Sequence, residues 1–145
     1  PPLVVCGPKR SDADVVERLA AEKGISDQVY LPGYVEDAEL AGLYDEAAAY
    51  VQPSLYEGFG MPLLEAMYFE TPVIASNIAA IPEVAGDAAV YFDPYDAEDM
   101  AEKISRVIYD KKLRGELIYR GTQRLNEYSW KDSAHNLIHH LEQLK

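Results

Sequence analysis

Two glutamates, Glu57 and Glu65, stand eight positions apart in the stretch PSLYEGFGMPLLEAM, on either side of a glycine-rich turn. An ionised carboxylate accepts hydrogen bonds and donates none, so the pair is suited to binding hydroxyl groups. Gly58 and Gly60 remove Cβ atoms from the turn, which lets its backbone approach a ligand and adopt φ > 0. The pattern therefore predicts a turn that presents two acceptors to a ligand held close to the backbone.

A helix is expected to begin at Pro62, directly after this turn. Proline suits the first helical position, because its missing N–H costs nothing there. The free N–H groups of Leu63, Leu64 and their neighbours would face the turn at the positive end of the helix dipole, which favours an anion such as phosphate. No Lys or Arg lies between Lys23 and Lys103, so backbone groups, helix ends or cations from elsewhere must hold that anion.

The two carboxylates would lie on either side of the phosphate. Helical side chains lean toward the N-terminus, so Glu65 can reach the same cavity that Glu57 enters from the loop. Each carboxylate can accept two neighbouring hydroxyl groups. A phosphate between two hydroxyl-binding acids describes a sugar nucleotide, with ribose, diphosphate and hexose in a row. The alternative that the acids only complement the helix dipole stays open.

Strands and helices are expected to alternate along the chain, because short apolar runs come between helical patterns. The expected strands are residues 3–7, 28–33, 48–52, 72–76 and 88–92; the expected helices are residues 11–23, 37–47, 62–69 and 82–85, then three that begin after residue 96, near residue 112 and after residue 129. This order predicts an α/β fold with a mostly parallel, Rossmann-like, doubly wound sheet. Such sheets bind ligands at the carboxyl ends of their strands, where the glycine-rich turn falls.

Local signals set the expected ends of several helices. Ser11, Asp96 and Ser129 are predicted N-caps, since each is a short polar residue followed three positions later by an acid. Gly24 is the expected stop of the first helix. The first apolar run, residues 3–7, is expected to be buried on both faces, and Cys6 within it to be a buried, inert thiol.

Composition excludes several classes of protein. A chain of 145 residues, 48% of them hydrophobic and 26% charged, suffices for one globular domain. A net charge of −12 argues against nucleic acid or an anionic membrane as the main partner. No apolar run approaches the roughly 18 residues of a membrane span, so no direct membrane insertion is expected. The single cysteine allows no disulfide framework, and His135 and His139 lack a third ligand, so no metal site is expected.

Several stretches together resemble one enzyme family. Glu57 and Glu65 form a Glu-x7-Glu motif in a Pro-Ser-x-x-Glu-Gly-Phe-Gly context. The resemblance continues through VYLPGYVEDAELAGLYDEA (29–47), TPVIASNIAAIPEVAGDAAVYFDP (71–94) and the closing YSWKDSAHNL, and so covers nearly the whole chain. The sequence resembles the C-terminal, donor-binding half of GT-B glycosyltransferases, specifically the retaining family 4 (glycosyl transferases group 1).

The resemblance implies a fold and a set of roles. Residues 1–145 would be a single nucleotide-sugar-binding domain, the C-terminal half of a two-domain enzyme without the first strand of that half. Glu57 would be the catalytic residue, binding hydroxyls of the transferred sugar beside the reacting carbon, and Glu65 would bind the ribose. The remaining donor contacts would be Gly58, Phe59 and Gly60 for sugar and phosphate, Met61, Leu63 and Leu64 for the diphosphate, and Val35 and Asp37 near the base.

The implied reaction transfers a hexose from a nucleoside diphosphate sugar to an acceptor hydroxyl with retention, in polysaccharide, lipopolysaccharide or glycolipid synthesis. Members of this fold usually need no metal, so no cofactor is expected. The expected location is the cytoplasm, with the whole protein peripheral at the inner face of the membrane. The alternatives are a non-catalytic nucleotide- or sugar-binding module, or a sugar-nucleotide epimerase or a phosphorylase-like relative on the same fold.

Three departures from the family pattern carry expectations of their own. The strand and loop whose Arg and Lys clamp the phosphates in the family would precede this chain, and Lys9 and Arg10 do not match them. The N-terminal acceptor domain is also expected outside the chain, so the chain alone is expected not to catalyse transfer. Finally, Glu70 stands where the family ends a helix with Gly, which would cost about 1 kcal/mol if the left-handed conformation is kept.

Overall fold

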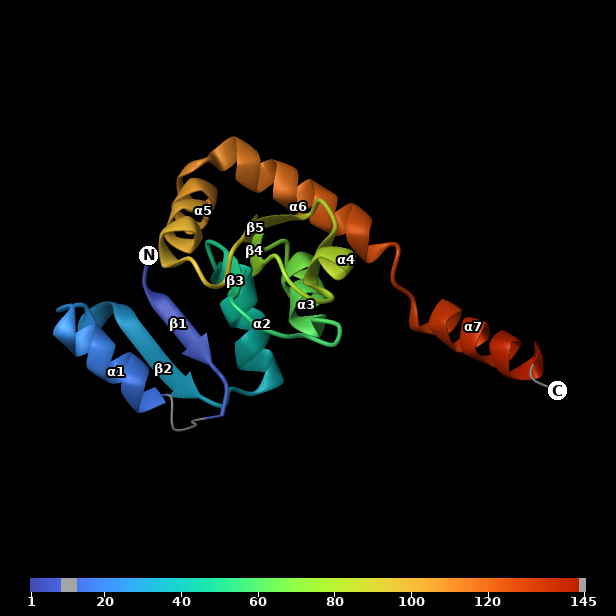
Figure 1. Cartoon of the computed structure of the whole chain (residues 1–145), viewed down its shortest axis with the longest axis horizontal. Coiled ribbons are helices and arrows are strands. Elements are labelled where there is room, and N and C mark those ends of the chain that lie inside the picture. Colours follow the sequence, from blue (N-terminus) through green and yellow to red (C-terminus); the bar gives the residue numbers. More distant parts are fainter. Residues whose placement is uncertain (9–12, 144–145) are drawn as a thin grey trace. The chain divides into compact units, whose positions relative to one another are not determined.

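Strands and helices alternate along the chain in the computed structural model, which describes residues 1–8 and 13–143 (Figure 1). The strands are β1 (Leu3–Cys6), β2 (Val29–Gly33), β3 (Tyr50–Gln52), β4 (Val73–Ser76) and β5 (Ala89–Phe92). The helices are α1 (Ala13–Glu22), the short 3-10 helix η1 (Ser26–Gln28), α2 (Asp37–Glu46), α3 (Met61–Tyr68), α4 (Ile81–Ala85), α5 (Ala97–Tyr109), α6 (Lys111–Leu125) and α7 (Trp130–Gln143). All strand pairs are parallel, which confirms the predicted α/β class. The predictions for Lys9, Arg10 and Ser11 lie outside the described residues.

The chain forms two compact units, Pro1–Glu46 (unit 1) and Ala47–Lys145 (unit 2). In unit 1, β1 pairs with β2, and Leu3 stands opposite Val29. The side chains of β1 are exposed and so is Cys6, so the predictions of a strand buried on both faces and of a buried thiol are wrong. The physical reason is that this sheet has only two strands, so β1 is an edge strand, and the helix of the unit that packs on the sheet, α1, contacts β2. An apolar run predicts a strand, but its neighbours decide how far it is buried.

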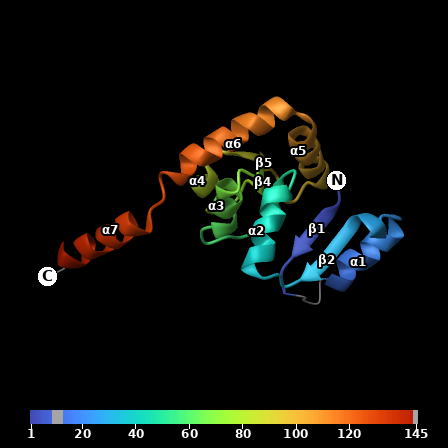
Figure 2. The same cartoon turned by 180° about the vertical axis from the view of Figure 1, so that it is seen from behind.

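Unit 2 is built on a three-stranded sheet in the order β3-β4-β5. The central strand β4 is buried along its whole length, so both of its faces are covered, as a doubly wound sheet requires. Ile74 of β4 joins Phe92, Val107 and Leu117 in one core cluster, which ties the sheet to α5 and α6. One turn after Leu117 and on the same face of α6, Gly121 lies so close to α3 that an added Cβ would stand 3.0 Å from Met67 Cγ. Figure 2 shows α6 running beside α3 and α4.

The helix ends follow from their capping residues. Asp96 Oδ1 accepts hydrogen bonds from two backbone N–H groups of the first turn of α5, at 2.9 and 3.1 Å. Ser129 Oγ accepts one from the Asp132 N–H at 3.2 Å at the start of α7. Gly24, with φ of 68°, ends α1. The predicted caps at Asp96 and Ser129 and the predicted stop at Gly24 are therefore confirmed.

The end of α3 has a left-handed residue that is not glycine. Glu70 has a φ of 54°, and its N–H donates to the Met67 carbonyl at 3.1 Å. The next N–H, that of Thr71, donates to the Ala66 carbonyl at 2.9 Å. This pair of bonds is a Schellman motif with Glu70 at the position where glycine is preferred. The left-handed conformation expected at Glu70 is thus kept, at a cost of about 1 kcal/mol.

Helix α7 has an apolar stripe that it does not bury. Leu137, Ile138 and Leu141 are each more than half exposed, and no described residue of α7 is buried. Stripes of this kind predict that a helix is amphipathic; they do not predict what covers it.

Among the helices of residues 1–8 and 13–143, none has both the length and the hydrophobicity that a membrane span requires.

Candidate functional site

The Glu57 carboxylate is held at the carboxyl end of β3. Gln52 Nε2 donates to Glu57 Oε1 at 2.6 Å, and Ser54 Oγ donates to the same oxygen at 2.8 Å. Gln52 is the last residue of β3 and is buried, whereas Glu57 is half-buried in the turn that follows. Hydrogen bonds to a charged group are stronger than bonds between neutral groups, so two of them restrict how this carboxylate rotates.

A chain of side chains supports these two donors. Gln52 Nε2 also donates to Ser54 Oγ at 2.9 Å, and the Tyr50 hydroxyl donates to Gln52 Oε1. The Ser76 hydroxyl, at the end of β4, donates to the Ser54 carbonyl at 2.7 Å. The carboxyl ends of two neighbouring parallel strands thus fix the turn that carries Glu57, which is where doubly wound sheets place their ligands.

The turn itself ends in a left-handed glycine. Gly60 has a φ of 95°, and a Cβ added there would stand 3.0 Å from Leu63 Cδ1, so glycine is required on both counts. Helix α3 begins at Met61, and Pro62 therefore occupies its second position, one residue later in the helix than predicted.

One of the N–H groups predicted to be free is not. The Leu63 N–H donates to the Gly60 carbonyl, three residues earlier, at 3.0 Å, in the tight 3-10 geometry that helix ends often adopt. The side chain of Leu63 is fully buried and that of Leu64 nearly so, which anchors the first turn of α3 in the core. The prediction of a free Leu63 N–H is therefore wrong, and the positive end of the helix dipole remains as the local attraction for an anion.

The other predicted site residues fall into two groups. Glu65 lies on α3, half-buried, one turn after the helix begins; Gly58, Phe59 and Met61 are exposed beside it in unit 2. Val35 and Asp37 belong to unit 1, where Asp37 is the exposed first residue of α2. Val35 is half-buried and lines a cavity of about 760 Å³ between β2 and α2, together with Tyr30 and Tyr34. The structure thus gathers the sugar, phosphate and ribose candidates on one turn and helix, and it places the base candidates in the other unit.

A brace from α6 reaches the same region. Arg124 Nε donates to the Val84 carbonyl at 2.9 Å and a second nitrogen donates to the Glu83 carbonyl, at the end of α4. The Tyr128 hydroxyl donates to the Val84 carbonyl at 3.1 Å, and the Tyr128 ring meets Phe59 edge to face, with centroids 5.6 Å apart. Arg124 and Tyr128 thus satisfy carbonyls at the end of α4 and support one residue of the glycine-rich turn.

Sequence reasoning missed Gln52, Arg124 and Tyr128. A glutamine at the end of an apolar strand, directly before the motif, is a signal that could have pointed to Gln52, because a buried amide needs hydrogen-bond partners. Glu83 is exposed in the first turn of α4, and its backbone carbonyl accepts a hydrogen bond from Arg124.

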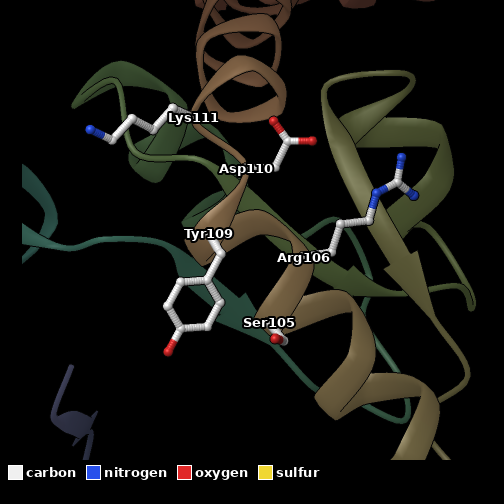
Figure 3. A pocket seen from close by; sticks show the side chains of 5 residues that line it. All are labelled: Ser105, Arg106, Tyr109, Asp110 and Lys111. Carbon is white, nitrogen blue, oxygen red and sulfur yellow. The ribbon is translucent and has the colours of Figure 1, made fainter.

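A second cavity, of about 670 Å³, opens where α5 meets α6 (Figure 3). Asp110 there caps α6, its Oδ1 accepting from the Lys112 and Leu113 N–H groups at 3.0 Å. The side chains of Arg106, Tyr109 and Lys111 point away from one another in Figure 3, so they do not converge on a common ligand position. None of the predicted site residues lines this cavity.

Tyr91 and Asp99, both in unit 2, have shifted pKa values. Burial raises the pKa of Tyr91 to about 12, and its hydroxyl donates to the Gly86 carbonyl at 2.6 Å. The backbone N–H of Asp93 and the ammonium group of Lys103 lower the pKa of Asp99. Both shifts belong to structural hydrogen bonds away from the glycine-rich turn.

In the part of the chain that the structure describes, no three His, Cys, Asp or Glu residues gather into a group that could hold a metal ion.

Parallel strands that alternate with helices, with the glycine-rich turn at a strand end, define the class of protein: an α/β protein. Sucrose-phosphate synthase from Thermosynechococcus elongatus has this fold, with a TM-score of 0.85 and 30% sequence identity over 98% of this chain and 38% of the synthase chain. Residues 1–124 match the model of the family Glycosyl transferases group 1, and the chain belongs to that family. The resemblance to the glycosyl transferases group 1 is thereby confirmed.

Two relatives show the relation at the level of sequence. The O-antigen chain mannosyltransferase B of Escherichia coli is 35% identical over 137 residues, which make up 94% of this chain and 36% of the relative. The MMP alpha-(1->4)-mannosyltransferase of Mycolicibacterium hassiacum is 38% identical over 122 residues, 81% of this chain and 30% of the relative. The chain therefore spans about a third of the length of the relatives it matches.

Proposed function

We propose that this chain binds the nucleoside diphosphate sugar of a retaining, family 4 glycosyltransferase. The observation that carries the proposal is the Glu57 carboxylate, which Gln52 and Ser54 hold at the carboxyl end of β3, directly before the turn that opens α3. A fixed carboxylate beside a helix N-terminus offers a site for hydroxyl groups next to a site for phosphate.

Each predicted site residue takes a role in this proposal. Glu57 binds hydroxyls of the donor sugar near its reacting carbon, and Glu65 binds the ribose hydroxyls. The backbone of Gly58, Phe59 and Gly60 contacts sugar and phosphate; Met61, Leu63 and Leu64 form the first turn of α3 below the diphosphate; Val35 and Asp37 lie near the base. The buried side chains of Leu63 and Leu64 keep that turn rigid, so its dipole is already in place when the phosphates arrive.

The proposed reaction moves a hexose to an acceptor hydroxyl. The bond between the anomeric carbon and the diphosphate oxygen breaks, the acceptor oxygen forms a bond on the same face, and the acceptor proton passes to the leaving diphosphate. The negative charge of Glu57 stabilises an oxocarbenium-like transition state, and the N-terminus of α3 stabilises the growing charge of the diphosphate. No metal is proposed to take part.

The sugar and the setting are proposed from the relatives. Two of them are named mannosyltransferases, and one of these acts on the O-antigen chain. We therefore propose mannose as the transferred hexose and a polysaccharide, lipopolysaccharide or glycolipid as the product. The whole enzyme is proposed to include an acceptor-binding domain and to work in the cytoplasm, peripheral at the membrane.

Calorimetric titration of the full-length enzyme with UDP-, GDP- and ADP-mannose tests the proposal. One of the three should bind, and Glu65→Ala should weaken its binding by about 1–3 kcal/mol through the lost charged hydrogen bonds. Glu98→Ala is the matched control, because Glu98 is an exposed acid in the first turn of α5 and can only complement a helix dipole. If Glu65→Ala and Glu98→Ala leave affinity equally unchanged, Glu65 does no more than Glu98. If no nucleotide sugar binds, the proposed function is wrong.

A further inference from the structure

Gln52 is a buried amide whose side-chain nitrogen and oxygen are both hydrogen-bonded, the nitrogen toward the predicted sugar site. Its side-chain nitrogen donates to Glu57 Oε1 at 2.6 Å and to Ser54 Oγ at 2.9 Å, and its oxygen accepts from the Tyr50 hydroxyl. An amide has one oxygen and one nitrogen end, and a carboxylate accepts only from the nitrogen end. The Glu57 carboxylate therefore selects the orientation in which the Gln52 nitrogen donates to it, and the Tyr50 hydroxyl, which can donate as well as accept, donates to the amide oxygen in that orientation.

The two donors on Glu57 meet at the same oxygen. Gln52 and Ser54 both bond to Oε1, and among residues 1–8 and 13–143 no donor is placed on Oε2. Bonding one oxygen from two directions fixes the plane of the carboxylate and leaves the second oxygen to accept from a ligand. This is the arrangement that a site needs in order to hold a sugar hydroxyl in one geometry.

We propose that Gln52 is a positioning residue of the donor-sugar site: it orients the Glu57 carboxylate so that Oε2 receives a hydroxyl of the transferred sugar, and the Tyr50 hydroxyl satisfies the amide oxygen that Gln52 turns away from Glu57. The inference rests on the proposed function of Glu57. Gln52 does not touch the sugar in this account; it acts through Glu57.

A purely structural role for Gln52 would consist of tying down the turn of residues 53–57. Ser76→Ala is the matched variant for that role. Ser76 Oγ donates to the Ser54 carbonyl at 2.7 Å, so it holds the same turn, but it makes no bond to Glu57. Ser76→Ala loosens the turn and leaves both donors to Glu57 in place, whereas Gln52→Met loosens the turn and removes one of the two donors that hold the carboxylate. Methionine has about the length of glutamine and no donor.

Steady-state kinetics of the full-length enzyme separate the two roles. We expect Gln52→Met to lower kcat by about 10- to 100-fold, as a small misplacement of a group at the reacting centre does. KM for the donor should change by less than about threefold, because the nucleotide and phosphate contacts remain. Ser76→Ala should lower kcat by a smaller factor than Gln52→Met does, because both donors to the Glu57 carboxylate remain in that variant. Equal losses of kcat in Gln52→Met and Ser76→Ala, or a change in KM without a change in kcat in Gln52→Met, would overturn the inference.

A double variant tests whether Gln52 acts through Glu57. In a Glu57→Ala background, Gln52→Met should cause no further loss of kcat, since the group it positions is gone. A second loss as large as that in the unmodified background would show that Gln52 acts by another route and overturn the inference.

Nuclear magnetic resonance of the full-length enzyme gives a readout that does not depend on activity. Glu57→Gln should move the signals of the Gln52 side-chain NH₂ group, because it removes the charge that this group faces. Unmoved signals would contradict the contact itself. If the signals move but Glu57→Ala leaves transfer intact, the contact stands while the proposed function of Glu57 fails, and the inference fails with it.

Discussion

Replacing Glu70 with glycine should stabilise unit 2, although no side-chain contact is gained. Glu70 is exposed, lies at the end of α3 with a φ of 54°, and occupies the glycine position of a Schellman motif. The two backbone bonds of the motif, Glu70 N–H to Met67 and Thr71 N–H to Ala66, use no side-chain atom and persist in the variant. The change therefore acts on backbone conformation and on one charge.

Three effects set the magnitude. A non-glycine residue in the left-handed region costs about 1–2 kcal/mol, which glycine removes. Glycine also gives the unfolded chain more freedom, which opposes the gain by about 0.4–1 kcal/mol. Removing an acid from the negative, C-terminal end of a helix dipole stabilises the folded state by about 0.3 kcal/mol. The expected net gain is about 1 kcal/mol, or a rise in Tm of roughly 3–4 °C for a chain of this length.

Urea titrations followed by circular dichroism, with scanning calorimetry, would measure this gain. Glu70→Gln is the matched control, because it removes the charge and keeps the backbone strain, so it should gain only about 0.3 kcal/mol. Glu70→Asn should fall between the two, since Asn tolerates the left-handed region better than most residues. If Glu70→Gly is no more stable than Glu70→Gln, the reasoning about backbone strain is refuted.

Three further substitutions test unit 2. Asp96→Ala removes the acceptor for two N–H groups of α5 and should lower the free energy of unfolding by about 1 kcal/mol in urea; an unchanged midpoint would contradict the capping role. Arg124→Met should lower the free energy of unfolding by about 2–3 kcal/mol, because it leaves two carbonyls of α4 without their charged donor. Arg106→Met, at an exposed arginine, is the control and should change the free energy of unfolding little. Equal losses in the two variants would show that Arg124 does not stabilise α4. The pKa of Tyr91 is raised from 10.0 to about 12, so the stability it contributes is complete below about pH 10 and is lost as pH rises through about 12. Tyr91→Phe should therefore flatten the alkaline fall in stability, and an identical slope would argue against the shift.

The positions of strands and helices could be predicted because the signals for them act over a few residues. The run at residues 72–76 predicts a strand, and β4 is Val73–Ser76. Asp96 and Gly24 mark helix ends through bonds or backbone angles that involve only their near neighbours. The Glu70 conformation was predictable for the same reason.

Burial and long-range contacts could not be predicted in the same way. The residues of β1 read as a buried strand, but a sheet of two strands leaves Cys6 exposed. Arg124 donates a hydrogen bond to the carbonyl of Val84, 40 positions away in the sequence, and no local pattern predicts that contact. The candidate turn was recognisable from Glu57 and its glycines, whereas the support from Gln52 needed the orientation of a buried amide.

The most direct test of the central claim compares two ligands on two variants. The full-length enzyme is titrated with a nucleoside diphosphate and with the same nucleoside diphosphate carrying its sugar. The account predicts that Glu65→Ala weakens both ligands by about 1–3 kcal/mol, because both contain the ribose. Glu57→Ala should leave the affinity of the free nucleoside diphosphate unchanged and should lower turnover. Equal effects of the two variants on the free nucleoside diphosphate would contradict the assignment of the two carboxylates to opposite sides of the phosphate.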